Sequence, residues 1–283
     1  MISTRQIKYI QSLQQKKFRT LHDVFVAEGD KIVSELLESG LEIEAVFALP
    51  EWFEDIEPGL LPQDAFFEVS PKELGRISGQ KTPNQVVAVV RKPAHTLPDS
   101  FTSQELVLML DRIQDPGNLG TMLRTADWFG VKHIVCSPDT AEVYNPKVIQ
   151  ASMGSFMRVK LYYAELADFL EKMKAELPVY GAFLDGDNVF EAELQVPAVL
   201  LIGNESQGIL RELERYVSHR LMIPAGRAGD ATVLAEHVSK RLEHSASRDK
   251  HATRHAESLN AAVAAGILMG CFRNRTTKSS LEK

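Results

Sequence analysis

The residues whose types and spacing could do chemistry lie in the stretch from Asp111 to Val131. The continuous apolar run Leu106–Leu110 precedes it and is typical of a buried strand in a parallel sheet. A turn-rich polar segment holding Asn118 follows, and apolar residues then recur at helical spacing around Arg124. Ligands of open α/β sheets bind at the carboxyl ends of strands, so this amide and this guanidinium would suit a phosphate or a ribose. The alternative is a capped surface helix whose arginine is solvated.

Two later segments also contain motifs that accompany the Asn118–Arg124 stretch. Leu201–Gly208 reads LIGNESQG and ends an apolar run, and Met222–Pro224 is followed much later by Glu257–Gly266. These three motifs, in this order, resemble those of the SpoU (TrmH-like) family of the SPOUT superfamily. The resemblance implies an RNA ribose 2′-O-methyltransferase that uses S-adenosylmethionine. It also implies a C-terminal trefoil knot, an exception to the rule that chains do not thread through themselves.

The resemblance assigns roles to individual positions. The catalytic set that it implies is Arg124 with Asn118, Glu205, Ser258 and Asn260. The backbone around Gly203, Ile223 and Leu259 would hold the S-adenosylmethionine. Arginine stays protonated at ordinary pH, so orienting the target phosphate and stabilising charge on the 2′-oxygen suits Arg124 better than acting as a general base.

The remainder of the chain alternates between short strands and helices. In the first ninety residues we predict strands at 24–27, 43–48 and 86–90. We also predict one helix capped by Asp30 and another that a capping box at Ser70 begins. Beyond residue 105 we predict strands at 106–110, 133–136, 157–162, 179–184, 199–202 and 220–223, and helices at 121–129, 165–176 and 210–216. The fold class predicted is α/β with a mostly parallel sheet. No GxGxxG follows a strand, so a Rossmann dinucleotide site is not supported.

The pattern also predicts how the chain divides. We expect a small α/β RNA substrate-binding domain at 1–92, which looks like the ribosomal-protein-like domain that many SpoU enzymes carry in front. A proline-containing linker at 93–104 and the methyltransferase domain at 105–283 follow.

The charge of the chain is unevenly distributed. The net charge is −6, so no global basic field indicates a nucleic-acid partner. The first 22 residues nevertheless contain no acid and five cations, which we expect to bind RNA: Arg5, Lys8, Lys16, Lys17 and Arg19. The alternative is a solubilising first helix.

The chain departs from the family between Pro224 and Glu257, where family members have a short loop. An insertion at about 226–256 occupies the loop that should hold the cofactor. Loop-closure cost grows slowly with length, so such an insertion is tolerable if its ends stay close. Four histidines lie within it, but no cysteine or carboxylate pattern supports a metal site, and we expect none. The alternative function is therefore an RNA-binding protein of SpoU fold whose cofactor binding the insertion impairs.

Composition indicates the compartment. Two isolated cysteines, no apolar leader and no apolar run of about 20 residues predict a soluble, cytoplasmic protein without a membrane partner. RNA, either ribosomal or transfer RNA, is the expected partner. The family's last helix commonly packs against a second subunit, so we also expect a homodimer. A methyltransferase of the same superfamily acting on a small molecule or a protein fits the basic N-terminal segment less well.

Overall fold

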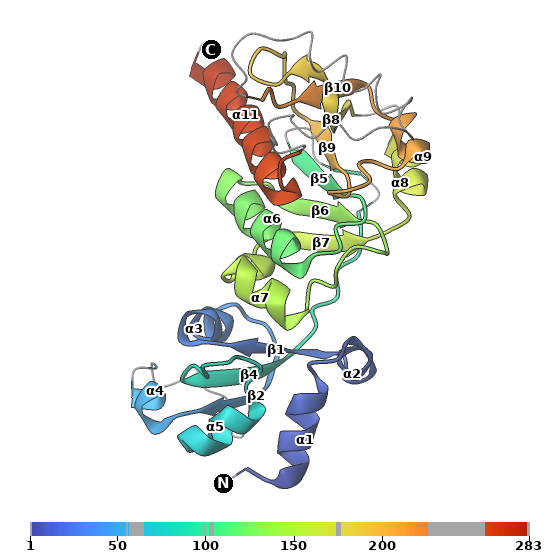
Figure 1. Ribbon diagram of the computed structural model, residues 1–283. Helices are drawn as coiled ribbons and strands as arrows, with labels where there is room; N and C mark the ends of the chain where they lie inside the picture. The colour runs from blue at the N-terminus through green and yellow to red at the C-terminus, as the bar shows by residue number, and fades with distance from the viewer. Residues whose placement is uncertain are drawn as a thin grey trace, which may run out of the picture.

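The computed structural model describes residues 2–54, 56, 65–98, 100–101, 105–173, 177–225 and 258–281. These residues form two sheets, each with its own helices, one above the other in Figure 1. Within them, no helix is both long enough and apolar enough to cross a membrane.

The smaller sheet has the strand order β1-β4-β2-β3. Its strands are β1 (Val24–Glu28), β2 (Ile43–Ala48), β3 (Phe66–Glu68) and β4 (Val86–Arg91). Its helices are α1 (Thr4–Ser12), α2 (Lys16–His22), α3 (Asp30–Glu38), α4 (Pro50–Glu54) and α5 (Pro71–Ile77). Alternate residues of a strand point to opposite faces: Val24 and Val26 pack with α1 and α5, whereas Phe25 and Ala27 pack with α3.

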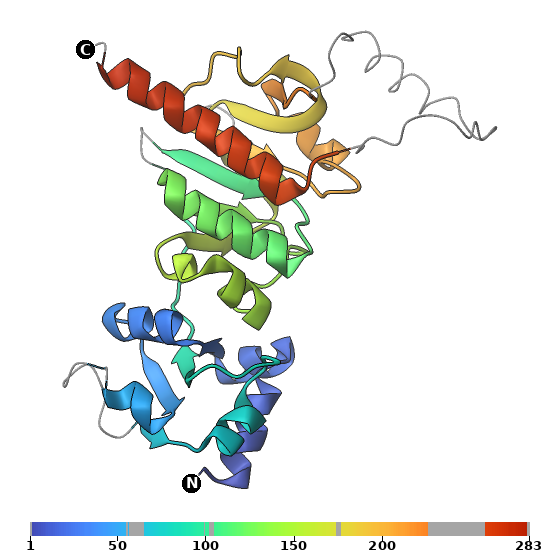
Figure 2. The same ribbon diagram turned by 60° about the vertical axis from the view of Figure 1, so that its left-hand side comes forward.

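The larger sheet has the order β10-β8-β9-β5-β6-β7, and every paired strand in it is parallel. Its strands are β5 (Leu106–Leu110), β6 (His133–Cys136), β7 (Lys160–Tyr163), β8 (Val179–Asn188), β9 (Ala198–Ile202) and β10 (His219–Met222). Helices α6 (Pro116–Phe129), α7 (Pro146–Ser152) and α11 (Ala261–Leu281) cover one face, and α8 (Leu166–Met173) and α9 (Arg211–Glu214) cover the other (Figures 1 and 2). The predicted parallel α/β sheet is confirmed.

Several predicted boundaries were wrong for local reasons. Helix α6 begins at Pro116 rather than at residue 121, because the Asp115 side chain caps it by accepting a hydrogen bond from the Asn118 N–H at 2.8 Å. The predicted strand 157–162 begins only at Lys160, since 155–157 form a 3₁₀ turn. Gly29, not Asp30, occupies the cap position of α3, and the Asp30 carboxylate instead accepts from the Trp52 indole at 2.8 Å.

Helix α7 was not predicted at all. Its signal is short: Asn145 caps the helix by accepting from the Lys147 N–H at 2.9 Å, and Pro146 takes the first position. The helix packs closely on α6 and also reaches β1 of the smaller sheet, where the Gln150 amide donates to the Glu28 carbonyl at 2.6 Å.

The segment between the two sheets packs on the larger one. Leu97 and Phe101 contact the apolar cluster under α8 and α9, and the ring of Phe101 lies 5.0 Å from that of His133. The His133 imidazole is hydrogen-bonded to the Tyr162 hydroxyl at 3.2 Å. Burial lowers the pKa of His133, and this effect outweighs the opposing attraction of Glu105 at 3.7 Å.

The lowered pKa of His133 predicts how stability depends on pH. The unfolded chain takes up the imidazole proton near the ordinary pKa of 6.5, whereas the folded chain takes it up only at lower pH. Stability from the neutral ring is therefore complete above about pH 6.5 and is lost as the pH falls below it. His133→Gln should flatten the decline in the urea midpoint between about pH 7 and pH 5. An unchanged slope in this variant would contradict the assignment.

Candidate active site

The carboxyl end of β5 carries a buried ion pair. Asp111 is fully buried, and its two carboxylate oxygens accept from the Arg112 Nε at 3.0 Å and Nη2 at 3.1 Å. The same carboxylate accepts from the Leu210 N–H at 2.8 Å. Arg112 adopts a positive φ of 54°, which few residues other than glycine do, and its own N–H donates to the Ser137 hydroxyl at 2.8 Å. Asp111 and Arg112 are thus each held by a further hydrogen bond in addition to the ion pair between them.

This ion pair holds the loop that follows β9. The Arg112 guanidinium donates to the Gln207 side chain and to the Gly208 carbonyl at 3.2 Å, and the Arg112 carbonyl accepts from the Asn204 amide at 2.9 Å. Within the loop, Asn204 and Gly208 exchange backbone hydrogen bonds at 3.0 and 2.8 Å. A Cβ on Gly203 would lie only 2.3 Å from the Gly208 backbone, so the close return of the loop requires glycine.

Three predicted catalytic residues form one hydrogen-bonded chain. The Asn260 carbonyl oxygen Oδ1 caps α11 by accepting from the N–H groups of Ala262 at 2.9 Å and Val263 at 3.3 Å. The Asn260 amide donates to Asn118 Oδ1 at 2.9 Å, and the Asn118 amide donates to Glu205 Oε2 at 3.2 Å. Residues from α6, from the loop after β9 and from the start of α11 therefore meet at one point. Ser258 is exposed just ahead of this point.

Arg124 lies on the outer face of α6. It is exposed, and its side chain makes no hydrogen bond or ion pair with any described residue. It lies six positions after Asn118, which is about 9 Å along the helix axis, and helical side chains lean toward the N-terminus. Its guanidinium is thus available to a ligand at the N-terminal end of α6.

Gly120 serves packing. It precedes the predicted start of the helix at residue 121 but lies within α6, where a Cβ would come 2.5 Å from the Ala151 Cβ and 2.8 Å from the Val148 carbonyl oxygen. The glycine lets α6 and α7 approach closely.

The predicted cofactor residues are placed at the carboxyl edge of the sheet. Gly203 directly follows β9, Ile223 directly follows β10, and Leu259 precedes α11 with 46% of its surface exposed. Backbone groups at strand ends beside apolar side chains are a donor set that fits the adenine and ribose of S-adenosylmethionine. The insertion at 226–256 and Glu257 lie outside the described residues.

The predicted RNA-binding cations do not all reach solvent. Arg5 and Lys8 on α1 and Lys16 and Lys17 on α2 are exposed. The prediction was wrong for Arg19, which is 2% exposed and forms an ion pair with Glu142. Glu142 belongs to the larger half of the molecule, which is the larger sheet with its helices and loops. A guanidinium already surrounded by protein acceptors has no face left for a phosphate.

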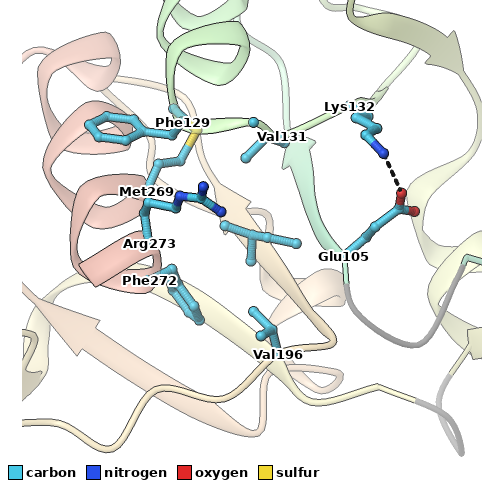
Figure 3. Close-up of a pocket in the computed structure, with 10 residues that line it drawn as sticks. Glu105, Phe129, Val131, Lys132, Val196, Met269, Phe272 and Arg273 are labelled. Atoms are coloured by element: carbon cyan, nitrogen blue, oxygen red, sulfur yellow. Dashed lines mark ion pairs between the residues drawn. The ribbon is translucent and has the colours of Figure 1, made fainter. Parts of the chain in front are cut away.

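A hollow at the opposite edge of the sheet is not part of this site. Figure 3 shows Phe129, Met269 and Phe272 around it, beside an ion pair of 3.5 Å between Glu105 and Lys132. These residues lie at the amino end of β5, away from Asp111 and Asn118. Among the described residues, no cluster of His, Cys, Asp and Glu could hold a metal ion.

Sequence comparison identifies relatives along the chain. The SpoU rRNA Methylase family matches residues 105–231, and the MRM3-like substrate binding domain matches residues 4–88. The 23S rRNA (guanosine(2553)-2′-O)-methyltransferase RlmP of Bacillus subtilis (strain 168) is 30% identical over 273 residues, which cover 94% of each chain.

Solved structures agree. A protein assigned to the TrmH family of RNA methyltransferases from Porphyromonas gingivalis is 35% identical, with a TM-score of 0.79 over 97% of this chain and 99% of that one. An AdoMet-bound rRNA methyltransferase from Sinorhizobium meliloti is 28% identical, with a TM-score of 0.77 over 97% of this chain and 96% of that one. The family and fold class expected from the motifs are confirmed: the chain belongs to the SpoU family and is an S-adenosylmethionine-dependent RNA 2′-O-methyltransferase.

Proposed function

We propose that this enzyme methylates a ribose 2′-hydroxyl of large-subunit ribosomal RNA at the carboxyl edge of its larger sheet. The observation that carries the proposal is the hydrogen-bonded chain from Asn260 through Asn118 to Glu205. Arg124, whose side chain has no partner within the described residues, lies on the same helix as Asn118. The substrate class is supported by the 23S rRNA relative from Bacillus subtilis. Bound S-adenosylmethionine supplies an electrophilic methyl group, which Gly203, Ile223 and Leu259 would hold at this edge.

The chain of hydrogen bonds fixes which atoms face the substrate. Because Asn260 donates to Asn118 Oδ1, the Asn118 amide nitrogen must point at Glu205 Oε2. The other carboxylate oxygen of Glu205 makes no hydrogen bond within the described residues and can accept one from a ribose hydroxyl. In this scheme Asn118 and Asn260 position Glu205, and Glu205 would orient the ribose hydroxyl toward the edge at which Gly203, Ile223 and Leu259 would hold the methyl donor.

Arg124 supplies the positive charge. Its planar guanidinium can bind a phosphate of the target nucleotide in bidentate fashion. A fixed cation beside the 2′-oxygen would stabilise the negative charge that develops there as the hydroxyl proton passes to solvent. Ser258, exposed at the start of the α11 region, completes the polar surface that faces the RNA.

The N-terminal domain binds the substrate in this proposal. Residues 1–92 form the RNA substrate-binding domain, 93–104 the linker and 105–283 the methyltransferase domain. The cations that contact RNA are Arg5, Lys8, Lys16 and Lys17, on helices α1 and α2. Figure 2 supports this, since α1 and α2 lie on the same side of the molecule as the N-terminal ends of α6 and α11.

Further features follow the family. We infer that the C-terminal segment forms a trefoil knot, and that the enzyme acts in the cytoplasm, where ribosomal RNA is found. We also infer a homodimer. In its support, Trp128 is 84% exposed and lies one turn beyond Arg124, and Val263 on the adjacent α11 is 50% exposed. Large exposed aromatic residues are typical centres of protein interfaces.

Replacement of the motif arginine tests the chemistry. Arg124→Ala should lower labelled-methyl transfer to ribosomal RNA at least about 100-fold, because the transition-state charge loses its cation. Calorimetric affinity for S-adenosylmethionine should stay near that of the wild type. Lys172→Ala, at an exposed cation on α8, is the matched control and should keep full activity. Normal turnover in Arg124→Ala would refute the assigned role.

The inserted segment can be tested by calorimetry. The intact chain should bind S-adenosylmethionine, and a variant lacking residues 229–254 should bind it with similar affinity, because a long insertion costs little once its ends are close. Binding by the shortened variant alone would instead favour the alternative, an RNA-binding protein whose cofactor loop is blocked.

The dimer surface can be tested by one substitution. Trp128→Asp should give a monomer by sedimentation, because a carboxylate would be buried at the centre of the interface. Leu21→Asp, at a residue on α2 that is 71% exposed, is the control and should leave the dimer intact. A wild-type chain that sediments as a monomer would exclude the dimer.

A further inference from the structure

The two halves of the chain are joined by a buried group of charges. The Arg19 side chain, from α2, is 2% exposed and that of Glu142, from the loop after β6, is 11% exposed. Glu142 Oε2 accepts from the Arg19 Nε at 3.2 Å and also from its Nη2, while Glu142 Oε1 accepts from the Lys92 Nζ at 3.3 Å. One carboxylate of the larger half thus binds two cations of the smaller half.

Arg19 is also fixed within its own half. Its Nη1 donates to the carbonyls of Leu13 and Gln14, both at 2.8 Å, which lie in the turn between α1 and α2. The guanidinium therefore connects this turn to Glu142. The exposed Lys16 and Lys17 are on the same short helix as Arg19, so whatever they bind is held at a fixed distance from Glu142.

The loop that carries Glu142 is equally fixed. The Tyr163 hydroxyl donates to the Ala141 carbonyl at 2.6 Å and accepts from the Val143 N–H at 2.8 Å. Tyr144 stacks on Phe25 of the smaller half, with ring centroids 4.8 Å apart. These contacts leave the loop little freedom on either side of Glu142.

The other end of the same loop touches the candidate active site. Ser137 accepts from the Arg112 N–H at 2.8 Å and is within hydrogen-bonding distance of the Thr140 hydroxyl at 3.1 Å. Arg112 in turn holds the loop after β9 that carries Glu205. Polar contacts at both ends of the loop 137–142 thus connect α2, through the backbone of this loop, to the residues that would orient the ribose.

We infer that Glu142 and Arg19 are positioning residues, which set the location of RNA bound on α2 relative to the methyl-transfer site. The inference rests on the proposed function, because it needs RNA on α2. Small displacements of a reactant lower the rate of transfer strongly. Loss of the Glu142 charge leaves Arg19 and Lys92 buried without their counter-ion, so the two halves separate at this edge. RNA affinity, which depends on the surface lysines, stays the same while kcat falls.

The test uses Glu142→Gln in the full chain, with Glu35→Gln as the matched control. Glu35 forms a different ion pair between the halves, at 2.8 Å to Arg158, and Arg158 keeps its partner Asp127 in that variant. We expect kcat for ribosomal RNA to fall at least about 10-fold in Glu142→Gln, with unchanged RNA and S-adenosylmethionine affinities. The control should keep its kcat. Arg19→Gln combined with Glu142→Gln should be no worse than the single change, since both act through one contact.

A structural readout separates this inference from the proposed function. Small-angle scattering should show a broader distribution of distances between the two halves in Glu142→Gln than in the wild type or Glu35→Gln. An active wild type with unchanged kcat and scattering in Glu142→Gln would overturn the inference, as would a parallel loss of RNA affinity. A wild type that transfers no methyl to RNA would refute the proposed function, and the inference with it, whatever the scattering shows.

Discussion

The buried ion pair between Asp111 and Arg112 is the interaction on which the site depends. A buried carboxylate is stable only with full compensation, and here Arg112 and the Leu210 N–H supply it. The loop after β9 is therefore held against the end of β5. Without this pair, Glu205 would stand on a loop held mainly by its own backbone bonds and by Asn118.

The site is assembled from parts that are distant in sequence because parallel strands end at one edge. The polar segments after β5 and β9 meet there, and α11 begins beside them. Asn260 takes part both in the start of α11 and in the site. One carboxamide satisfies N–H groups at the helix start with its oxygen and orients Asn118 with its nitrogen. Helix capping and active-site geometry thus depend on the same side chain, so a substitution of Asn260 changes both.

Sequence reasoning succeeded where local pattern decides structure and failed where burial decides it. The apolar run before Asp111 and the capping box at Ser70 are local, and the structure has both. Arg19 looked like Lys16 and Lys17 in sequence, yet only the arrangement of the two halves reveals that it faces Glu142. The roles of Asp111 and Arg112 were missed for the same reason, although a charged pair directly after a buried strand was the available signal. The roles of the five catalytic candidates stay predictions.

The packing of the connecting segment limits how the two halves could have been combined in evolution. Leu97 and Phe101 complete the apolar surface of the larger half even though they precede its first strand. A fragment beginning at Glu105 would expose that surface and the ring of His133. If front domains were exchanged between relatives, the larger half would keep its apolar surface covered only when the junction lay before Leu97. The segment that must be inherited together is therefore longer than the larger sheet and its helices.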